Sequence, residues 1–96
     1  MKLTNKQIID HLVTNNPLEY NVLKAAEEFQ ELALALTQKI TKPNGNRDQE
    51  VIDEIGDCII RLRILKKMYP KDKIKERVNY KLGKFQEYID KGYKQI

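Results

Sequence analysis

The sequence predicts an all-α fold, a small four-helix bundle-like domain that occupies residues 1–96. Apolar residues recur at spacings of three and four along most of the chain, which is the period of an amphipathic helix. Turn-forming residues gather at only a few points, so short connections should join the helices. The chain is long enough for one hydrophobic core, and it contains no internal repeat.

The first break between helices is predicted near residue 16. Thr4 and Gln7 fit a capping box that opens a first helix, which should run to about Thr14. Asn16 is a suitable N-cap for the second helix. Pro17 suits its first position, because the N–H that proline lacks would be unpaired there.

The second helix should continue to about Ile40. It carries one apolar stripe, formed by Leu18, Val22, Ala25, Phe29, Leu32, Leu36 and Ile40. A loop should follow over residues 41–47, where Pro43, Asn44 and Gly45 favour a turn and no apolar residue could anchor a regular element.

The third helix should span residues 48–68 and stop before Pro70, which disfavours helical geometry in the preceding residue. Its apolar residues spread widely around the helix: Val51, Ile52, Ile55, Cys58, Ile59, Ile60, Leu62, Ile64 and Leu65. A surface helix of a monomer needs a narrower face, so we infer that the third helix also meets a second subunit in a dimer or tetramer. A fourth helix should follow residues 70–72 and end near Gly92.

The charge is distributed unevenly along the chain. Residues 1–60 contain six Lys or Arg against ten Asp or Glu, whereas residues 61–96 contain twelve against four. The basic segment could supply cations for phosphate groups, could meet nucleic acid, or could be a solvated surface, which is the commonest explanation of charge runs.

Other features bound the class of protein. Cys58 is the only cysteine, so an intrachain disulfide is excluded, and its apolar neighbours predict a buried structural thiol. No apolar run approaches the roughly twenty residues of a membrane span, and the polar N-terminus lacks the apolar core of a signal peptide. We therefore expect a cytoplasmic protein without a membrane partner.

Two acidic clusters are the main functional signal. Glu28 and Glu31 are three residues apart on the second predicted helix, and Glu54 and Asp57 have the same spacing on the third. Residues three apart lie on one helix face, so four carboxylates on adjacent helices could hold a hard divalent cation. Mg²⁺ fits best, with Mn²⁺ as the second candidate, which suggests an enzyme acting on a polyphosphate.

A structural explanation of these carboxylates competes with the metal hypothesis. Lys24 precedes Glu28 by four residues and Arg61 follows Asp57 by four, so each pair could form an ordinary surface ion pair. Glu31 would still lack an evident partner, as would Glu54. The sequence therefore favours the metal hypothesis over the structural one.

The acidic motifs resemble those of a known family. Glu27-Glu28-x-x-Glu31 followed by Glu54-x-x-Asp57 is similar to the EExxE and ExxD pair of the all-α nucleoside triphosphate pyrophosphohydrolases, the MazG-like superfamily. The resemblance extends from about Leu18 to Tyr88 and is greatest to small phage-type or bacterial members. Gly56 departs from the common pattern, in which Ala often precedes the Asp.

The resemblance implies Mg²⁺-dependent cleavage of a nucleoside triphosphate between its α- and β-phosphates. The products would be the monophosphate and pyrophosphate. The metal ligands by motif position would be Glu28, Glu31, Glu54 and Asp57. The first motif, Glu27, Glu28 and Glu31, would be catalytic, with Glu27 as a ligand of a second metal or as the residue that orients the attacking water. Family members are typically dimers or tetramers, which agrees with the broad apolar surface of the third helix.

Cations that could meet the substrate phosphates lie mainly in the fourth predicted helix. Arg77, Lys81 and Lys84 align beside its apolar face, and the family often has a basic position near this point. Arg47 in the loop is a further, weaker candidate. The sequence does not identify the base or sugar of the substrate.

Two other classes of function stay open. A small basic helical nucleic-acid-binding protein would explain the charge of residues 61–96 and would make the carboxylates incidental. A catalytically silent oligomerisation module is the third class. With an enzyme as the main hypothesis, we expect a nucleoside triphosphate and further copies of the chain as partners, and we do not expect nucleic acid.

Overall fold

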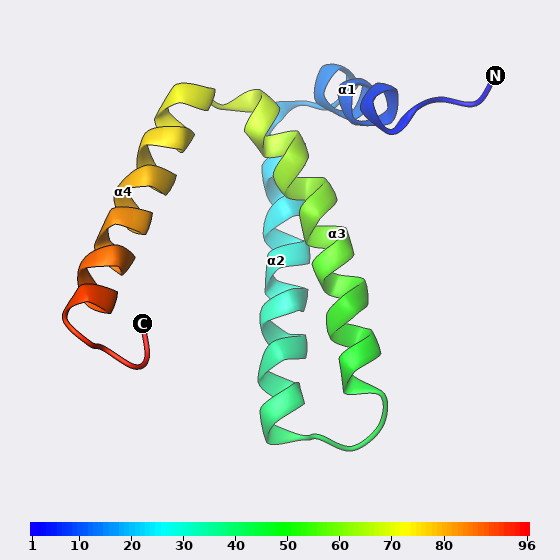
Figure 1. Cartoon of the computed structure of the whole chain (residues 1–96). Helices are drawn as coiled ribbons and strands as arrows, with labels where there is room; N and C mark the ends of the chain where they lie inside the picture. The colour runs from blue at the N-terminus through cyan, green and yellow to red at the C-terminus, as the bar shows by residue number, and fades with distance from the viewer.

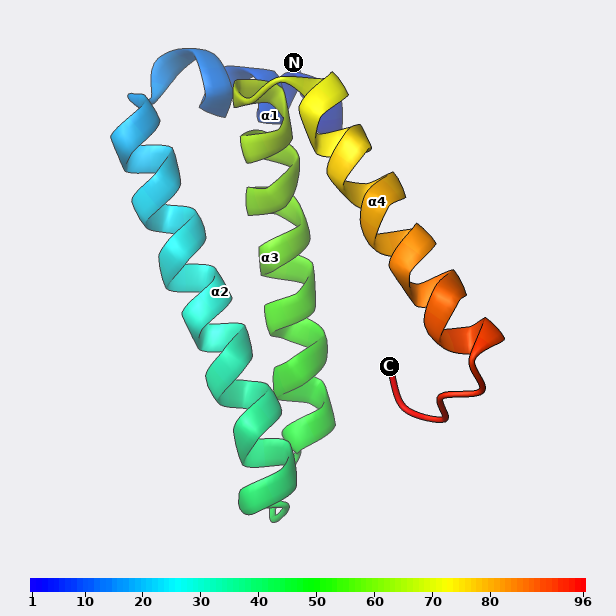
Figure 2. The same cartoon turned by 90° about the vertical axis from the view of Figure 1, so that its left-hand side faces the viewer.

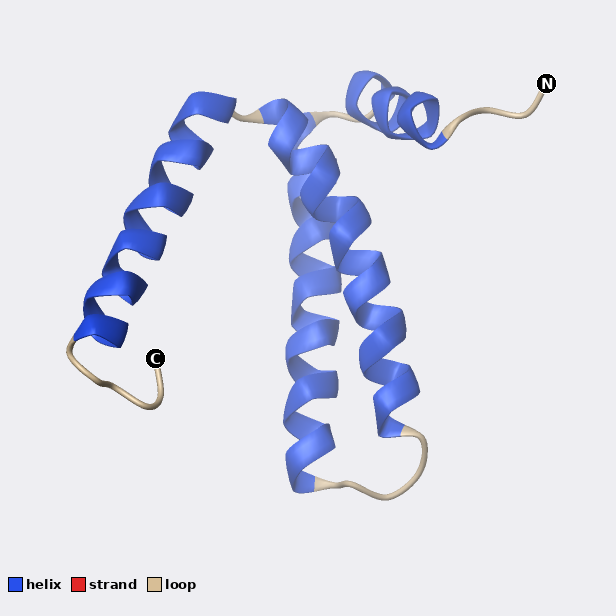
Figure 3. Cartoon of the chain, in the orientation of Figure 1, coloured by secondary structure: helices blue, strands red, loops and turns tan.

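Four helices and no strand make up the protein, as the sequence predicts (Figure 3). The structure is a computed structural model that describes all of residues 1–96. Its helices are α1 (Asn5–Asn15), α2 (Leu18–Thr41), α3 (Arg47–Met68) and α4 (Lys71–Asp90). The predicted ends differ from these by only one or two residues, which is the usual uncertainty of a helix boundary.

The long helices α2 and α3 run antiparallel and lie side by side in both views (Figures 1 and 2). A short loop joins them, where Gly45 has a φ of 83°, a left-handed conformation that favours glycine. Asn46 then caps α3 by accepting a hydrogen bond from the N–H of Gln49. The helix α1 packs across the other end of this hairpin, where α2 begins and α3 ends (Figure 1).

The predicted cap of α1 is confirmed, whereas the predicted cap of α2 is wrong. The Thr4 hydroxyl accepts from the N–H of Gln7, and the Gln7 side chain accepts from the N–H of Thr4 at 2.8 Å. The N-cap of α2 is Pro17 and not Asn16, and it makes no side-chain capping bond. The amide of Asn16 is used elsewhere, because it donates to the side-chain oxygen of Asn21 at 3.2 Å.

Asn21 holds the junction of three helices together. Only 1% of it is exposed, and its amide nitrogen donates to the backbone carbonyl of Leu12 in α1 and to the sulfur of Met68 in α3. Since a buried polar group is costly without partners, these bonds favour one arrangement of α1 on the hairpin. Around this junction and along the hairpin lie the buried residues of the core: Ile9, Ala25, Ala35, Cys58 and Ile64.

The helix α4 stands apart from the rest of the chain. It contacts α3 near the connecting turn and touches neither α1 nor α2, so it diverges from the hairpin in both views (Figures 1 and 2). The radius of gyration is 17.0 Å, against about 12.5 Å for a compact domain of this length. The helices are those that the sequence predicts, but a single copy does not close them into a bundle.

Much apolar surface therefore stays open in one copy. Only six of the 96 residues are buried, and the accessible surface is 7914 Å². A folded monomer of this mass exposes about 5,700 Å². No helix has an apolar stretch of the length that crossing a membrane requires.

Replacing Asn21 should destabilise the protein through this junction. We expect Asn21→Ala to lower the free energy of unfolding by about 1–3 kcal/mol, because the carbonyl of Leu12 loses its donor in a buried place. Urea denaturation followed by circular dichroism measures the change. The matched control is Asn79→Ala on the exposed surface of α4, which should have little effect. Equal losses in the two variants would contradict the role given to Asn21.

Candidate metal centre

The α2–α3 hairpin brings three acidic side chains together. Glu28 comes from α2, while Glu54 and Asp57 come from α3, and one carboxylate oxygen of each lies within 4.8 Å of the other two. The sequence predicted this convergence from two separate motifs. The three side chains converge because the helices are antiparallel and the two motifs face each other midway along the hairpin.

Small residues and one hydrogen bond lie where the two helices meet at this point. The thiol of Cys58 donates to the backbone carbonyl of Glu28 at 3.2 Å. Cys58 and Ala25 are both buried, and their small size lets the two helices approach closely. The predicted burial of Cys58 is thus confirmed. Burial, and then the nearby charges of Glu28 and Glu54, raise the pKa of the thiol, so it stays protonated at neutral pH.

Two carboxylate oxygens in the cluster have no protein partner. The Oε2 atoms of Glu28 and Glu54 are buried and accept no hydrogen bond, although both side chains are half-buried rather than exposed. A buried polar atom without a partner is uncommon in folded proteins and costs free energy. These two atoms are therefore suited to bind a cation or to accept from a hydrogen-bond donor.

Electrostatic repulsion within the cluster points the same way. Loss of hydration raises the pKa of Glu28 and of Glu54, and the charges of Glu31 and Asp57 raise both further. Arg61 opposes this shift at Glu28, because its positive charge favours the carboxylate. The protein alone therefore makes two of these carboxylates harder to ionise than free glutamate.

The other residues of the first motif differ in their positions. Glu31 is exposed at the edge of the cluster, close enough for its charge to act on both Glu28 and Glu54. Glu27 is exposed and forms an ion pair with Lys24 at 3.3 Å. Glu27 is thus the one acidic motif residue that the structure does not associate with the cluster.

The competing ion pairs expected from the sequence do not form. Lys24 pairs with Glu27 rather than Glu28, and Arg61 has no carboxylate within 4.0 Å. Instead, the Nη1 atom of Arg61 is buried without a hydrogen-bond acceptor beside the cluster. Sequence reasoning missed this residue as a site candidate. Its spacing of four from Asp57 gave the signal, but the spacing alone suggested an ion pair.

The predicted substrate cations are not brought to the cluster within one chain. Arg77, Lys81 and Lys84 lie on α4, which does not contact α2. The guanidinium of Arg47 is occupied locally: it donates to the backbone carbonyl of Lys42 at 2.8 Å and to the side chains of Gln38 and Glu50. Arg47 therefore stabilises the α2–α3 loop in this structure.

Comparison with known proteins gives no assignment. No protein-family model matches the chain, and neither the curated proteins nor the solved structures contain a match to it.

The donor set limits the kind of ion that the cluster could hold. Carboxylate oxygens are hard ligands and suit Mg²⁺, Mn²⁺ or Ca²⁺, whereas the thiol of Cys58 is bonded to a carbonyl and is not part of the group. Oxygen ligands at about 2.1 Å from a Mg²⁺ ion lie about 3.0 Å apart when adjacent and about 4.2 Å apart when opposite, so three oxygens within 4.8 Å of one another would have to move closer together to bind one ion.

The raised pKa values predict a dependence of stability on pH in the absence of metal. Between the ordinary glutamate value of 4.5 and the raised values, the folded protein holds protons that the unfolded chain has lost. The cluster's contribution to the unfolding free energy should therefore fall as pH rises through this window.

Urea denaturation in EDTA, from pH 4.5 to neutral pH, measures this effect. Glu54→Gln should gain stability relative to the unmodified protein as pH rises, because it removes one of the repelling charges. The difference between the two proteins isolates the cluster, since Asp10, whose pKa Lys6 and Lys67 lower from 3.8, affects stability mainly below this range and does so equally in both. Glu19→Gln, at an exposed residue of α2, is the control. A constant difference across this range would contradict the assignment.

Proposed function

We propose that this protein is a Mg²⁺-dependent nucleotide pyrophosphohydrolase that cleaves nucleoside triphosphates between the α- and β-phosphates. The observation that carries the proposal is the convergence of Glu28, Glu54 and Asp57, with two buried carboxylate oxygens that lack any partner. The resemblance of the paired motifs to the MazG-like superfamily supplies the reaction. Mn²⁺ offers the same ligand preferences and could replace Mg²⁺.

The acidic residues have one shared role in this proposal, which is to hold the cation between α2 and α3. Glu28, Glu54 and Asp57 would bind it directly, and Glu31 would reach in from the exposed edge. When bound, the ion supplies positive charge that neutralises phosphate oxygens and lowers the pKa of a coordinated water. Glu27 would orient the attacking water. For this it has to leave Lys24, and exposed ion pairs of this kind are worth only about 0–1 kcal/mol.

Arg61 adds a cation that the motifs do not include. Its side chain is half-buried beside Glu28 and has a guanidinium nitrogen without an acceptor. A guanidinium presents several N–H donors in a planar fork that matches phosphate oxygens. We assign Arg61 to the substrate phosphates, where it would stabilise the charge that builds up on the departing pyrophosphate.

The proposal also includes assembly into a dimer or tetramer through α3. One side of this helix carries an exposed stripe of Ile52, Ile55, Ile59 and Leu62, at the alternating spacings of three and four that form a helix–helix seam. One copy exposes about 2,200 Å² more than a compact monomer of its mass. If two copies buried this excess against each other, they would remove about 4,400 Å² of accessible surface from solvent. This area is within the range of about 2,000–5,000 Å² for obligate dimers.

Assembly would also decide whether α4 takes part in substrate binding. Within one chain, Arg77, Lys81 and Lys84 are separated from the cluster, because α4 does not reach α2. A role for these cations at the substrate phosphates therefore requires α4 of a second copy. The alternative functions, a nucleic-acid-binding protein or a silent oligomerisation module, would need no ion between α2 and α3.

Hydrolysis of nucleoside triphosphates tests the proposed activity. We expect a panel of canonical and modified triphosphates to yield pyrophosphate, and not orthophosphate, in Mg²⁺, with the activity lost in EDTA and restored by added Mg²⁺. Glu54→Gln should lower kcat/KM by more than about 100-fold, because it removes a charged ligand. Glu19→Gln is the control that keeps the same change of charge on an exposed site.

Three outcomes would contradict the proposed function. They are no turnover across the panel, orthophosphate as the only phosphate product, or full activity in Glu54→Gln. Thermal denaturation with and without Mg²⁺ then distinguishes an inactive variant that still binds the ion from one that no longer binds it. Binding of Mg²⁺ raises the melting temperature only while the ligands are present.

Sedimentation analysis tests the assembly. We expect the unmodified protein to sediment as a dimer or tetramer and Ile59→Glu to sediment as a monomer, since a charge in the centre of the apolar stripe would be buried without a partner. Ile96→Glu is the matched control, because Ile96 is similarly exposed but lies beyond the helices. A monomeric unmodified protein would contradict the proposed interface.

A further inference from the structure

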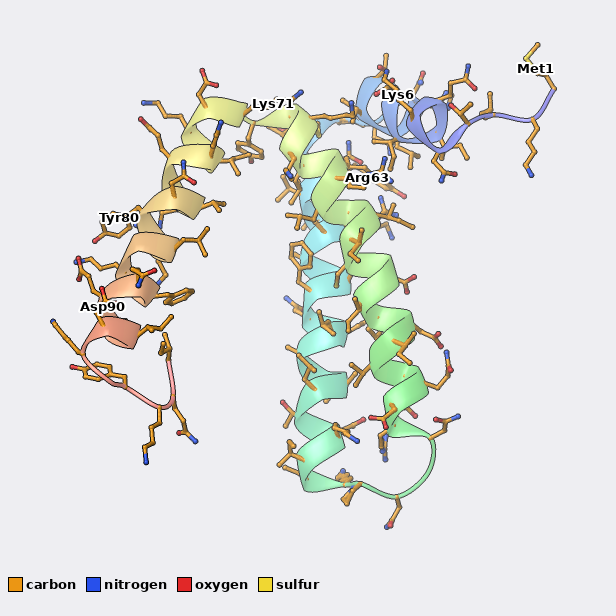
Figure 4. All side chains as sticks on the ribbon, in the orientation of Figure 1. Met1, Lys6, Arg63, Lys71, Tyr80 and Asp90 are labelled. Atoms are coloured by element: carbon orange, nitrogen blue, oxygen red, sulfur yellow. The ribbon has the colours of Figure 1, made fainter.

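The junction of α3 and α4 contains an apolar cleft of about 590 Å³. Its apolar lining comes from both helices and includes Leu62, Leu65, Ile74 and Val78. Figure 4 labels Arg63 and Lys71 on these two helices, on either side of the turn that joins them. Since α4 contacts neither α1 nor α2, no other helix of the same chain packs against the α4 wall of the cleft.

All the charged residues that line this cleft, and the groove beside it, are cations. Lys66 lines both spaces. Five of these cations have no carboxylate within 4.0 Å: Arg63, Lys66, Lys71, Lys75 and Arg77. Like charges without partners repel one another, so an occupant of the cleft should combine apolar side chains with carboxylates.

The first half of α3 has this combination on an open side. Ile52 and Ile55 are 58% and 43% exposed, and the side chain of Asp48, four residues before Ile52, is 72% exposed. At about 100° per residue, these three side chains project to the same side of the helix. Asp48 pairs with Lys39 at 2.6 Å, but a carboxylate has two oxygens and can accept from a second cation.

The other exposed apolar stripes of the chain match the cleft less well. The stripe of α4, which includes Val78 and Phe85, is bordered by Lys75 and Lys81, so the cations of the cleft would repel it. The stripe of α2 has no carboxylate in line with it: Leu18, Val22, Phe29, Leu36 and Ile40. The start of α3 is therefore the segment whose chemistry fits.

We propose that the start of α3 from a second copy fills this cleft, and that two copies do so reciprocally. The exposed stripe of α3 with its charged ends has spacings that read the same in both directions, 4-3-4-3-4: Asp48, Ile52, Ile55, Ile59, Leu62 and Lys66. When two such helices run in opposite directions, Asp48 faces Lys66 of the second copy, and Ile52 faces its Leu62. Leu62 and Lys66 both line the cleft, so this register brings Ile52 and Asp48 of the second copy to it.

This inference rests on the assembly included in the proposed function, and it adds the register and a role for α4 as one wall of the contact. It does not involve the metal site. Glu54 and Asp57 project to another side of α3, where they meet Glu28 of α2. Assembly and hydrolysis can therefore be measured separately, because association in this register needs no ion.

Exchange of the two charged ends tests the register. Sedimentation in EDTA should show that Asp48→Lys and Lys66→Glu each associate at least about tenfold more weakly than the unmodified protein, since either change sets like charges together at both ends of the contact. A one-to-one mixture of the two variants should associate as the unmodified protein does, because opposite charges meet again at each end. A fluorescent label on one variant identifies the mixed pair.

The matched controls carry the same charge changes elsewhere. Asp90→Lys at the end of α4 and Lys2→Glu at the chain start should each associate normally, and mixing them should change nothing. Circular dichroism verifies that all four variants keep their helices.

A further pair of variants tests the α4 wall. Val78→Glu should weaken association, because it puts a charge into the apolar lining opposite Leu62, whereas Asn79→Glu, at the next position of α4, should have little effect. Equal behaviour of these two variants would show that the copies meet without α4 and would overturn the cleft as the contact.

Two other results would overturn the proposal. One is a monomeric unmodified protein, in which α4 would have to close on its own hairpin. The other is a mixture of Asp48→Lys and Lys66→Glu that associates no better than either variant alone. An assembled protein that regains association in the mixture but hydrolyses no triphosphate would contradict the proposed activity and support this register.

Discussion

The packing of α2 against α3 is the constraint on which the rest of the structure depends. The hydrogen bond from the Cys58 thiol to the carbonyl of Glu28 links the two helices where both acidic motifs occur. A shift of α2 along α3 by one helical turn would move the carboxylates of the two helices about 5 Å apart, and they would no longer form a cluster. The same packing excludes water from one oxygen of Glu28 and one of Glu54. Stability and the candidate chemistry therefore share one interface.

The sequence predicted the helices well because their signals are local. The capping box of Thr4, the loop glycine Gly45 and the break at Pro70 each act within a few residues, and the structure has a boundary at each of them. The convergence of Glu28 with Glu54 was also predictable, since helical spacing and a short loop leave few ways to pair α2 with α3. The apolar stripes predicted the buried place of Cys58 by the same reasoning.

Features that depend on long-range partners could not be predicted. Asn16 has the chemistry of an N-cap, but its side-chain amide donates a hydrogen bond to Asn21 instead. This contact exists only once α1 has folded back on the hairpin. Arg61 has the spacing of an ion pair, yet it lies beside Glu28 without a carboxylate at bonding distance. The direction of α4 is the largest example. An amphipathic pattern predicts a helix and its apolar side, but it does not say whether that side meets the same chain or another copy.

The distribution of charge along α3 has a consequence for how two copies would meet. Between Arg47 and Asp57 the helix carries five carboxylates and one cation, and from Arg61 to Lys67 it carries four cations and no carboxylate. Each such helix is thus a rod with oppositely charged ends. Two of these rods placed head to tail set negative against positive along their whole length, whereas a parallel pair would oppose like charges at both ends. If two copies pair through α3, this charge distribution therefore favours an antiparallel, two-fold arrangement over a parallel one.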